Sequence, residues 1–334
     1  SHGNGKLMGT YSTVKGFNIQ SLASDPSNPS DGEVWYNTTS KALKGYGALG
    51  PSAWASTTAM NTGRSSSVNV GPSSSAVLII GGDPGGLLVV EEWNGTTWTE
   101  KGDIAGSHSA GAGGGTVTAA IVSGGGTYFT TTETFDGTSW TEQGDMLVGK
   151  GTAAGSGSTT SLKVSGGLEK IPAPAPNYGT NTVEDYNGTS WTNGTSMTRA
   201  AGYGQAGTPF SPSATALVMG QLNFPPMGSQ TTLVELWNGS SWTEMNDFTT
   251  PRHYGMGAGI STAAILVGGN PGRSDAQTFD GTNWTTIASI AAAAWSMSGG
   301  GSTTSCIAGG GDPGAPTAMQ ILGKTQTTKT FSSS

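Results

Sequence analysis

Apolar and polar positions along the chain form a short pattern that recurs five times. Each copy places an aromatic residue before an Asn-Gly or Asp-Gly pair and a Trp three residues after the glycine, as residues 132–142 show. This pattern predicts a β-hairpin, because Gly supplies the positive φ that a tight turn needs. The Trp ring should return beside the aromatic ring of the first strand. We expect mostly buried side chains for Trp98, Trp140, Trp191, Trp242 and Trp284.

The distance between these hairpins indicates a repeat architecture. Consecutive Trp residues of the pattern lie 42 to 51 positions apart. Each hairpin follows an apolar strand that closes on glycine, such as residues 76–82, and a run of small residues stands before that strand. Four short strands in a unit of this length describe the blade of a β-propeller. The sequence therefore predicts an all-β protein.

Glycine pairs after the second strand and a Trp in the fourth strand are also the hallmarks of the kelch repeat. The chain resembles kelch propellers over residues 50–323. A sixth unit begins at residue 298 but has no Trp strand, and the segment around Trp54 can supply one. We therefore predict a six-bladed kelch-like β-propeller closed by an N-terminal strand, because closure removes the exposed sheet edges. Residues 1–49 should form a stem with a β-hairpin, and residues 324–334 a C-terminal tail.

The first 50 residues differ from the repeats. A Pro-rich stretch from Asp25 leads into a predicted hairpin around Trp35-Tyr36-Asn37-Thr38-Thr39. This segment resembles a module found in tail-fibre and other virion proteins of tailed bacteriophages. The resemblance implies a location on the surface of the phage particle and contact with other virion proteins through the N-terminal segment.

Charge and cysteine content narrow the classes of partner. The net charge of −7 argues against nucleic acid as a partner. No window is long and apolar enough to predict membrane insertion. The single cysteine, Cys306, stands in an apolar strand, which predicts a buried thiol and no disulfide framework.

No pattern in the chain predicts catalytic chemistry, a metal site or a cofactor. The three His residues do not form a metal-binding spacing, and neither a Gly-x-Ser-x-Gly motif nor a phosphate loop occurs. Acidic residues recur two positions before the hairpin aromatic. Because they recur in several blades, we interpret them as structural hydrogen-bond acceptors between blades. They are Glu91, Glu133, Glu184 and Glu235, with Gln277 and Gln320 in the last two units.

Basic residues recur just before the predicted inner strand in five of the six units, and the sixth has Ala293. The loops after the glycine pairs should lie on the same face, and such variable loops are a common place for recognition. We therefore predict a binding face with basic and aromatic side chains. The alternative is that each basic residue pairs with an acid of a neighbouring blade. The predicted binding residues are Arg64, His108, Lys150, Arg199, Arg252, Tyr178, Phe224, Tyr254 and Trp295.

Three classes of function remain open from the sequence. The leading hypothesis is a non-enzymatic structural or adhesion protein of a phage virion, whose propeller binds a host-surface glycan or another virion protein. Acidic sugars would use the basic residues. A homotrimer formed through the first 50 residues would favour this fibre hypothesis. The alternatives are a carbohydrate-active enzyme, which a pocket with two or three carboxylates would favour, and a cellular kelch interaction module.

Overall fold

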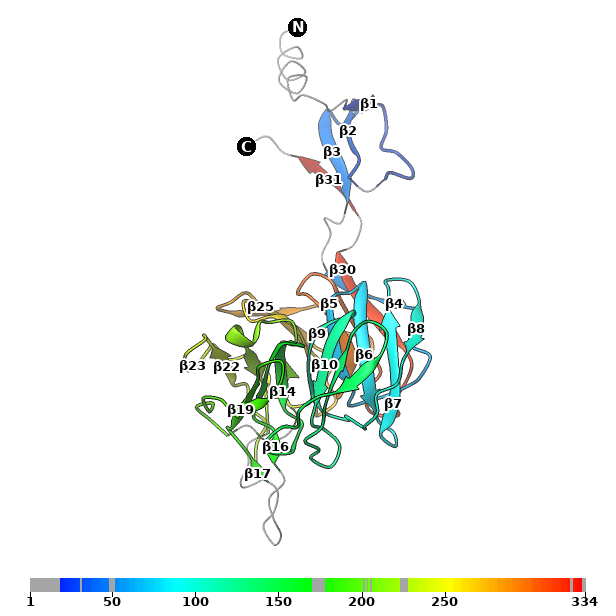
Figure 1. The fold of residues 1–334 in the computed structure, drawn as a ribbon. Helices are drawn as coiled ribbons and strands as arrows, with labels where there is room; N and C mark the ends of the chain where they lie inside the picture. Colours follow the sequence, from blue (N-terminus) through cyan, green and yellow to red (C-terminus); the bar gives the residue numbers. More distant parts are fainter. Residues whose placement is uncertain are drawn as a thin grey trace. The chain divides into compact units, whose positions relative to one another are not determined.

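The computed structural model describes residues 19–30, 32–47, 52–169, 178–200, 202, 204, 206–222, 228–324 and 327–331. The chain divides into two compact units. One, here the terminal unit, joins Ser1–Ala53 with Gly323–Ser334, and the other is Trp54–Leu322. The larger unit contains the repeats (Figure 1). The two units are described separately below.

The repeats form six four-stranded antiparallel sheets, numbered here as blades 1 to 6 in chain order. Their strands follow, from the inner to the outer strand of each blade. Blade 1 has β5 (Val68–Ser73), β6 (Ala76–Gly82), β7 (Leu87–Trp93) and β8 (Trp98–Lys101). Blade 2 has β9 (Ala112–Thr116), β10 (Ala119–Ser123), β11 (Thr132–Phe135) and β12 (Trp140–Glu142). Blade 3 has β14 (Ala154–Ser158), β15 (Ser161–Ser165), β18 (Val183–Tyr186) and β19 (Trp191–Asn193).

Blade 4 has β20 (Ala206–Gly207), β21 (Leu217–Met219), β22 (Val234–Trp237) and β23 (Trp242–Glu244), with a short 3-10 helix, η1 (Ser213–Thr215), between its first two strands. Blade 5 has β24 (Met256–Ile260), β25 (Ala263–Val267), β26 (Ala276–Phe279) and β27 (Trp284–Ile287). Blade 6 has β28 (Ser298–Gly301), β29 (Cys306–Gly309), β30 (Met319–Lys324) and β4 (Ser52–Thr57). A small additional sheet joins β13 (Lys150–Gly151), β16 (Leu168–Glu169) and β17 (Tyr178–Gly179).

The inner strands of the six blades form a closed ring. Each contacts the inner strand of the next blade, in the order β5, β9, β14, β20, β24, β28 and back to β5. Glycine allows this close approach. A Cβ atom added at Gly207 would lie 2.8 Å from the carbonyl oxygen of Gly155 on the neighbouring inner strand. The glycine-rich inner strands are therefore a steric requirement of the ring.

The ring closes through the N-terminal strand, as the missing sixth Trp strand predicts. Strand β4 is the outer strand of blade 6, beside β30. Trp54 packs against the buried cluster between blades 5 and 6, and its indole Nε1 donates a hydrogen bond to the carbonyl oxygen of Ala288, 2.8 Å away. The first and last segments of the propeller are thus joined in one sheet, which leaves no open edge between them.

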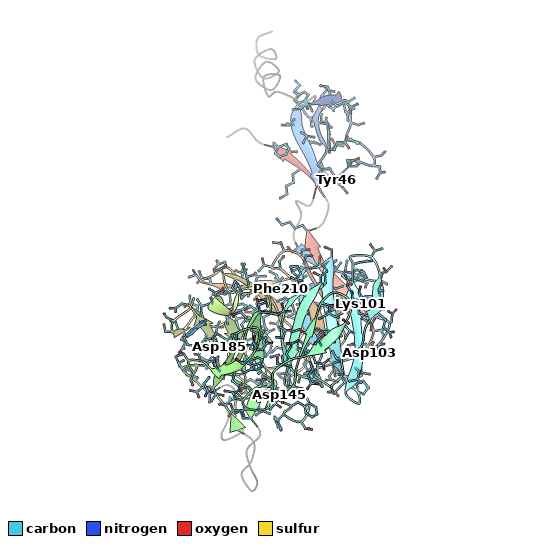
Figure 2. The ribbon with its side chains drawn as sticks, viewed as in Figure 1. Tyr46, Lys101, Asp103, Asp145, Asp185 and Phe210 are labelled. Carbon is cyan, nitrogen blue, oxygen red and sulfur yellow. The ribbon has the colours of Figure 1, made fainter. Side chains whose placement is uncertain are left out.

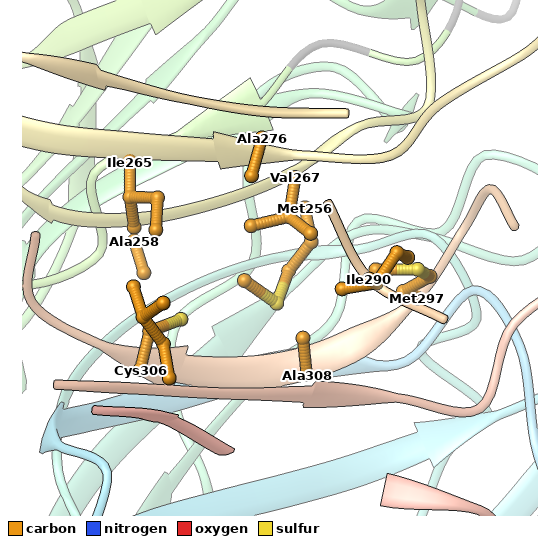
Figure 3. Packing of buried hydrophobic residues seen from close by; sticks show 10 residues of the cluster. Met256, Ala258, Ile265, Val267, Ala276, Ile290, Met297, Cys306 and Ala308 are labelled. Carbon is orange, nitrogen blue, oxygen red and sulfur yellow. The ribbon is translucent and has the colours of Figure 1, made fainter. Parts of the chain in front are cut away.

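Apolar side chains fill the spaces between neighbouring blades. Figure 3 shows the cluster between blades 5 and 6, where Met256, Ile265 and Val267 face Cys306 and Ala308. Cys306 is fully buried, and burial raises the pKa of its thiol far above the usual range. The prediction of a buried thiol is confirmed.

Each of the five predicted hairpins contains the expected pair of rings. Phe135 and Trp140 are opposite residues of β11 and β12, and their ring centroids lie 5.0 Å apart. The other four pairs have centroid distances of 5.1 to 5.6 Å. At the turn, the Asp136 carboxylate accepts hydrogen bonds from the N–H groups of Thr138 and Ser139, which lowers its pKa. Trp98, Trp191 and Trp242 are buried as predicted, whereas Trp140 and Trp284 are half-buried.

The terminal unit is a sheet made from both ends of the chain. Its strand order is β1 (Gln20–Leu22), β2 (Val34–Asn37), β3 (Ala42–Gly47) and β31 (Thr327–Phe331). Strands β2 and β3 form the predicted hairpin. The segment 324–334, expected as a separate tail, instead contributes β31, which pairs with β3 from Leu43 to Gly47. The Thr residues of this segment and Lys329 suit an edge strand.

One carboxylate organises the terminal unit. Asp25 accepts hydrogen bonds from Lys44 Nζ at 2.7 Å, Asn37 Nδ2 at 2.6 Å and Trp35 Nε1 at 3.0 Å. These donors, Lys44 first, lower the pKa of Asp25 to about 2. Trp35 is fully buried although the sheet is small. The loop that begins at Asp25 is therefore bound to strands β2 and β3 and forms part of the unit.

Closure by β4 can be tested by truncation. A chain of residues 58–324 lacks β4 and Trp54, so it exposes the edge of β30 and part of the core between blades 5 and 6. We expect this chain to lose the cooperative thermal unfolding transition that a chain of residues 52–324 shows in circular dichroism. Similar melting curves for the two chains would contradict closure by the N-terminal strand.

Candidate functional site

The strand order gives the propeller two different faces. Because the four strands of a blade alternate in direction, the connections into the inner strands and the loops after the second strands lie on one face, here the entry face. The hairpins between the first two and the last two strands lie on the other, here the turn face. Asp145, in the connection into blade 3, and Phe210, which follows the inner strand of blade 4, lie at opposite faces (Figure 2).

The recurring acids hold the connections that arrive at the entry face. Glu184 on β18 accepts hydrogen bonds from the backbone N–H groups of Leu147, at 2.7 Å, and Val148, at 3.2 Å. These two residues belong to the connection from blade 2 to blade 3. Equivalent bonds join Glu91 to Asn61 and Thr62, Glu133 to Ala105 and Gly106, Glu235 to Thr198 and Arg199, Gln277 to Thr249, and Gln320 to Ala291. The prediction of structural acceptors between blades is confirmed.

Four of the predicted binding residues are buried and not surface groups. They are called the pins below, because each ties the entrance of an inner strand to its own blade. Arg64 and Arg252 are 0% exposed, as is His108, and Lys150 is 1% exposed. Arg64 donates to the carbonyl oxygens of Gly81, at 3.0 Å, and Val89, at 2.7 Å, and forms an ion pair with Glu91. Its guanidinium therefore ties the entrance of β5 to the second and third strands of the same blade.

The other three pins follow the same plan. Arg252 donates to the carbonyl oxygen of Gly268, 2.8 Å away, and pairs with Asp275. His108 contacts the carbonyl oxygen of Gly124 at 2.6 Å and the Glu133 carboxylate at 3.2 Å, and Lys150 pairs with Glu169. The partners are acids of the same blade, so the prediction of pairing with a neighbouring blade was wrong in this detail. A buried charge requires such a partner.

Burial and ion pairing shift the pKa values of these groups in opposite directions. Burial lowers the pKa of the Arg64 and Arg252 guanidinium groups, and the facing acids Glu91 and Asp275 counteract this effect. Burial raises the pKa of Glu133, but hydrogen bonds from His108 and from two backbone N–H groups bring its net pKa below the usual value. The charges are therefore neutralised inside the blades, where a ligand on the surface cannot contact them.

Arg199 does not belong to the set of pins. Its side chain is 51% exposed and forms an ion pair with Glu244 at 2.8 Å. The backbone N–H of Arg199 donates to Glu235, as the N–H groups of Asn61 and Thr62 donate to Glu91 in blade 1. Arg199 therefore corresponds to one of these two residues and not to Arg64. Positive φ two positions later, at Ser66, Gly204 and Ser296, makes Gly202 in blade 4 and Ala294 in blade 6 the equivalents of Arg64. The sequence alignment was therefore shifted by three residues in blade 4 and by one in blade 6.

The described structure places the side chains of two of the four predicted aromatic residues. Phe224 and the side chain of Tyr178 lie outside the described residues. Tyr254 lies at the entrance of β24, with its ring centroid 5.0 Å from that of His253. Trp295 is half-buried on blade 6 beside the loop of blade 5, since a Cβ atom at Gly272 would lie 3.9 Å from its ring. Of the predicted set, Tyr254 is thus the aromatic residue that the structure places at the central axis.

A ring of left-handed residues surrounds that axis on the entry face. The residue two positions after each pin, or after its equivalent in blades 4 and 6, has a positive φ between 52° and 70°. Five of the six are not glycine, and this conformation is uncommon for such residues. They are Ser66, Ala110, Thr152, Gly204, Tyr254 and Ser296.

Backbone hydrogen bonds connect these residues from blade to blade. The N–H of Ser66 donates to the carbonyl oxygen of Ser296 at 2.9 Å, and that of Ser296 donates to Tyr254 at 2.8 Å. The bonds from Tyr254 to Gly204, from Ala110 to Ser66 and from Thr152 to Ala110 are 2.6 to 2.7 Å long. The left-handed conformation points the N–H and C=O groups along the ring, and these five bonds link the six residues from Thr152 through to Gly204.

Inside this ring lies a cavity of about 120 Å³, here the central well. Its walls are the first residues of the six inner strands: residues 66–69, 110–113, 152–155, 204 with 206–207, 254–257 and 296–297. Pro209 also lines the well. It follows the inner strand of blade 4, so it lies at the end of the well away from the entry face.

The segment after β20 closes the well from below. Phe210, from blade 4, packs against the core cluster of blades 1 and 2, on the opposite side of the ring. Ser211 accepts a hydrogen bond from the N–H of Ser261 in blade 5 at 2.6 Å, and Thr208 lies 3.4 Å from Ser156 of blade 3 through their hydroxyl oxygens. The segment therefore crosses the axis and closes the end of the well away from the entry face.

The well offers polar but uncharged groups. Among the described lining residues no Asp, Glu, Lys, Arg or His occurs, and Tyr254 carries the single titratable side chain. Its polar groups are hydroxyls, the Asn69 amide and backbone. A surface of this kind can bind a neutral ligand, but it provides neither a general acid and base pair nor a charged clamp.

Elsewhere in the described part of the chain, no group of three or more His, Cys, Asp or Glu residues is placed to hold a metal ion. None of its helices has the length and hydropathy that crossing a bilayer requires.

Comparison with known proteins bears on the fold. Neither a protein-family model nor a curated protein matches the sequence. Solved structures do match, among them one titled "Structure of YjhT", with a TM-score of 0.64 over 82% of this chain and 99% of the other. The fold is a β-propeller. At 11% sequence identity the likeness shows the fold alone.

The contrast between Arg252 and Arg199 can be tested by unfolding. Arg252→Ala leaves the Asp275 carboxylate and three carbonyl groups without their buried partner, which should lower the free energy of unfolding by about 3–5 kcal/mol. Arg199→Ala removes an exposed pair and should cost less than about 1 kcal/mol. Denaturant unfolding of both variants measures the difference. Equal losses would contradict the assignment of Arg252 as a pin.

Proposed function

We propose that this chain is a non-enzymatic structural and adhesion protein of a bacteriophage particle, of the tail-fibre or surface-fibre type. The observation that carries the proposal is the pairing of β3 with β31 in the terminal unit. The two ends of the chain build one module, and the propeller is inserted between them. This arrangement suits a protein in which one module attaches and the other recognises.

The motif that resembles phage virion proteins has a clear structural role, which supports this proposal. Trp35 is the core of the terminal unit, and the Asn37 side chain binds Asp25 and accepts hydrogen bonds from the N–H groups of Thr39 and Ser40. Those residues make a small sheet stable, so their occurrence together fits an attachment module used in front of different distal domains. Contact with other virion proteins through this unit is part of the proposal.

We assign the propeller to the kelch type. The glycine pairs at the ends of the second strands adopt positive φ, as at Gly81 and Gly82, and accept contacts from the pins. The Trp residues of the fourth strands form ring pairs with the third strands. These features give the kelch pattern a physical basis in this chain, and the recognition function rests on the entry face and the central well.

Binding is favoured over catalysis by the lining of the well. A carbohydrate-active enzyme needs titratable groups around the reacting atoms, and the acids of the entry face are engaged with backbone N–H groups and pins. One small site should bind weakly, so several copies on one particle would be needed for firm attachment. A homotrimer formed through the terminal unit would meet this need.

Immunogold electron microscopy tests the location, and cell binding tests the adhesion. Antibody against the propeller should label the surface of particles whose genome encodes this chain, and the purified chain should bind the host cells. Antibody absorbed with the purified chain is the control. Particles without label, or conversion of a host glycan to smaller products by the chain, would contradict the proposal.

A further inference from the structure

We infer that the central well binds one uncharged sugar unit at the end of a glycan chain. This inference rests on the proposed adhesion function and specifies its ligand. It names the chemistry that the described residues of the well can recognise, and it replaces the acidic sugar expected from the recurrent basic residues.

The size and shape of the central well favour the terminal unit of a glycan chain. The well has a volume of about 120 Å³, and since a cavity of about 10–15 Å³ already admits one water, the well has room for several. A space of this size admits no more than one sugar ring with its hydroxyl groups. Because Pro209 and Phe210 close the lower end, a polymer cannot pass through the propeller. A terminal unit can enter, whereas an internal unit of a chain cannot.

The described lining of the well carries no charged side chain, which favours an uncharged sugar unit. The carboxylate of an acidic sugar would lose water on entering the well and would meet no cation among the described lining residues. The nearest regular set of basic groups is the four pins, which are at most 1% exposed and paired with acids. Arg199, the exposed member of the predicted set, does not line the well.

Three consecutive residues of the left-handed ring provide the attractive contacts. Tyr254, Ser296 and Ser66 come from blades 5, 6 and 1 and are joined by their backbone hydrogen bonds. Within the described structure, the hydroxyl groups of Ser66 and Ser296 have no hydrogen-bond partner, although both residues are half-buried. An aromatic face beside a few fixed polar groups is a common arrangement for recognising a small polar ligand.

The rest of the wall keeps these groups in place. Asn69 accepts a hydrogen bond from the Ser67 hydroxyl at 2.9 Å and donates to the carbonyl oxygen of Ser67 at 3.2 Å. The Ser67 hydroxyl also lies 2.7 Å from that of Ser298. The contact with Ser298 connects blades 1 and 6 at the residue that follows Ser66. The site is therefore formed before a ligand arrives, which reduces the entropy lost on binding.

The chain itself suggests a variant that should fold. Ala110 occupies the left-handed position in blade 2, so the double variant Ser66→Ala/Ser296→Ala places a residue already accepted at this position in blades 1 and 6. It removes the two hydroxyl groups and leaves the backbone ring intact. A second variant, Ala110→Asn, adds bulk at the mouth of the well, and Asn tolerates a left-handed conformation. Arg199→Ala is the matched control outside the well.

Saturation-transfer NMR on the full chain is the experiment, with methyl glycosides as probes. The neutral probes are the glycosides of glucose, galactose, mannose and N-acetylglucosamine, and the acidic probes are those of glucuronic acid and a sialic acid. We expect at least one neutral glycoside to bind and the acidic ones not to bind at equal concentration. The double serine variant and Ala110→Asn should each weaken binding at least tenfold, and Arg199→Ala should leave it unchanged.

Contradicting results can be assigned to one proposal or the other. Binding of an acidic glycoside that Arg199→Ala abolishes would overturn the neutral ligand and leave the adhesion function standing. Binding of a neutral glycoside that neither well variant weakens would move the site away from the well. If the chain binds host cells but none of the glycosides, the inference about the well fails alone. If it binds neither, the proposed function fails as well.

Discussion

One hydrogen-bonding arrangement recurs through the propeller: a carboxylate or amide on the third strand of each blade holds the backbone of the connection from the preceding blade. In blades 1 to 4 a Glu accepts two consecutive backbone N–H groups, and in blades 5 and 6 a Gln accepts one. This contact sets where the chain enters each inner strand. The pins and the left-handed residues follow within a few positions. The geometry of the central well therefore depends on these six contacts.

The four pins place charged groups inside the blades, and neutral groups line the described part of the central well. Arg64 and Arg252 are fully buried and bind carbonyl groups and acids, so they contribute to the rigidity of the entry face and not to its surface charge. The free hydroxyl groups of Ser66 and Ser296 lie at the mouth of the well, next to Tyr254. Recognition by such a surface would depend on shape and hydrogen bonding, with little sensitivity to salt.

Local patterns were sufficient to predict the hairpins, the closing strand and the role of the recurring acids. The hairpin pairs follow from a turn and two aromatics within a few residues, and Glu184 follows from spacing along one strand. The basic residues could not be placed in this way. Spacing locates Arg64 before the inner strand, but only the folded blade shows that its side chain turns towards the carbonyl oxygen of Gly81.

Other features of the site had no clear sequence signal. Ser66, Thr152 and Tyr254 are not residue types that indicate a positive φ, so the left-handed ring depends on hydrogen bonds between blades that are distant in sequence. The floor of the well depends on Phe210 reaching the cluster on the far side of the ring, which the length of the blade 4 segment alone does not reveal. Contacts across the axis are the part of this fold that a repeat pattern describes least.

The contact between Glu184 and the connection at Leu147 and Val148 gives the most direct test of this account. Burial raises the pKa of Glu184, and blades 5 and 6 use Gln in its place, so an uncharged acceptor should serve as well. Denaturant unfolding should show that Glu184→Ala lowers the free energy of unfolding by about 1–3 kcal/mol, because buried N–H groups lose their acceptor. Glu184→Gln should lose less than half of that amount. Equal stability of Glu184→Ala and the unchanged chain would contradict the claim that these contacts position the inner strands.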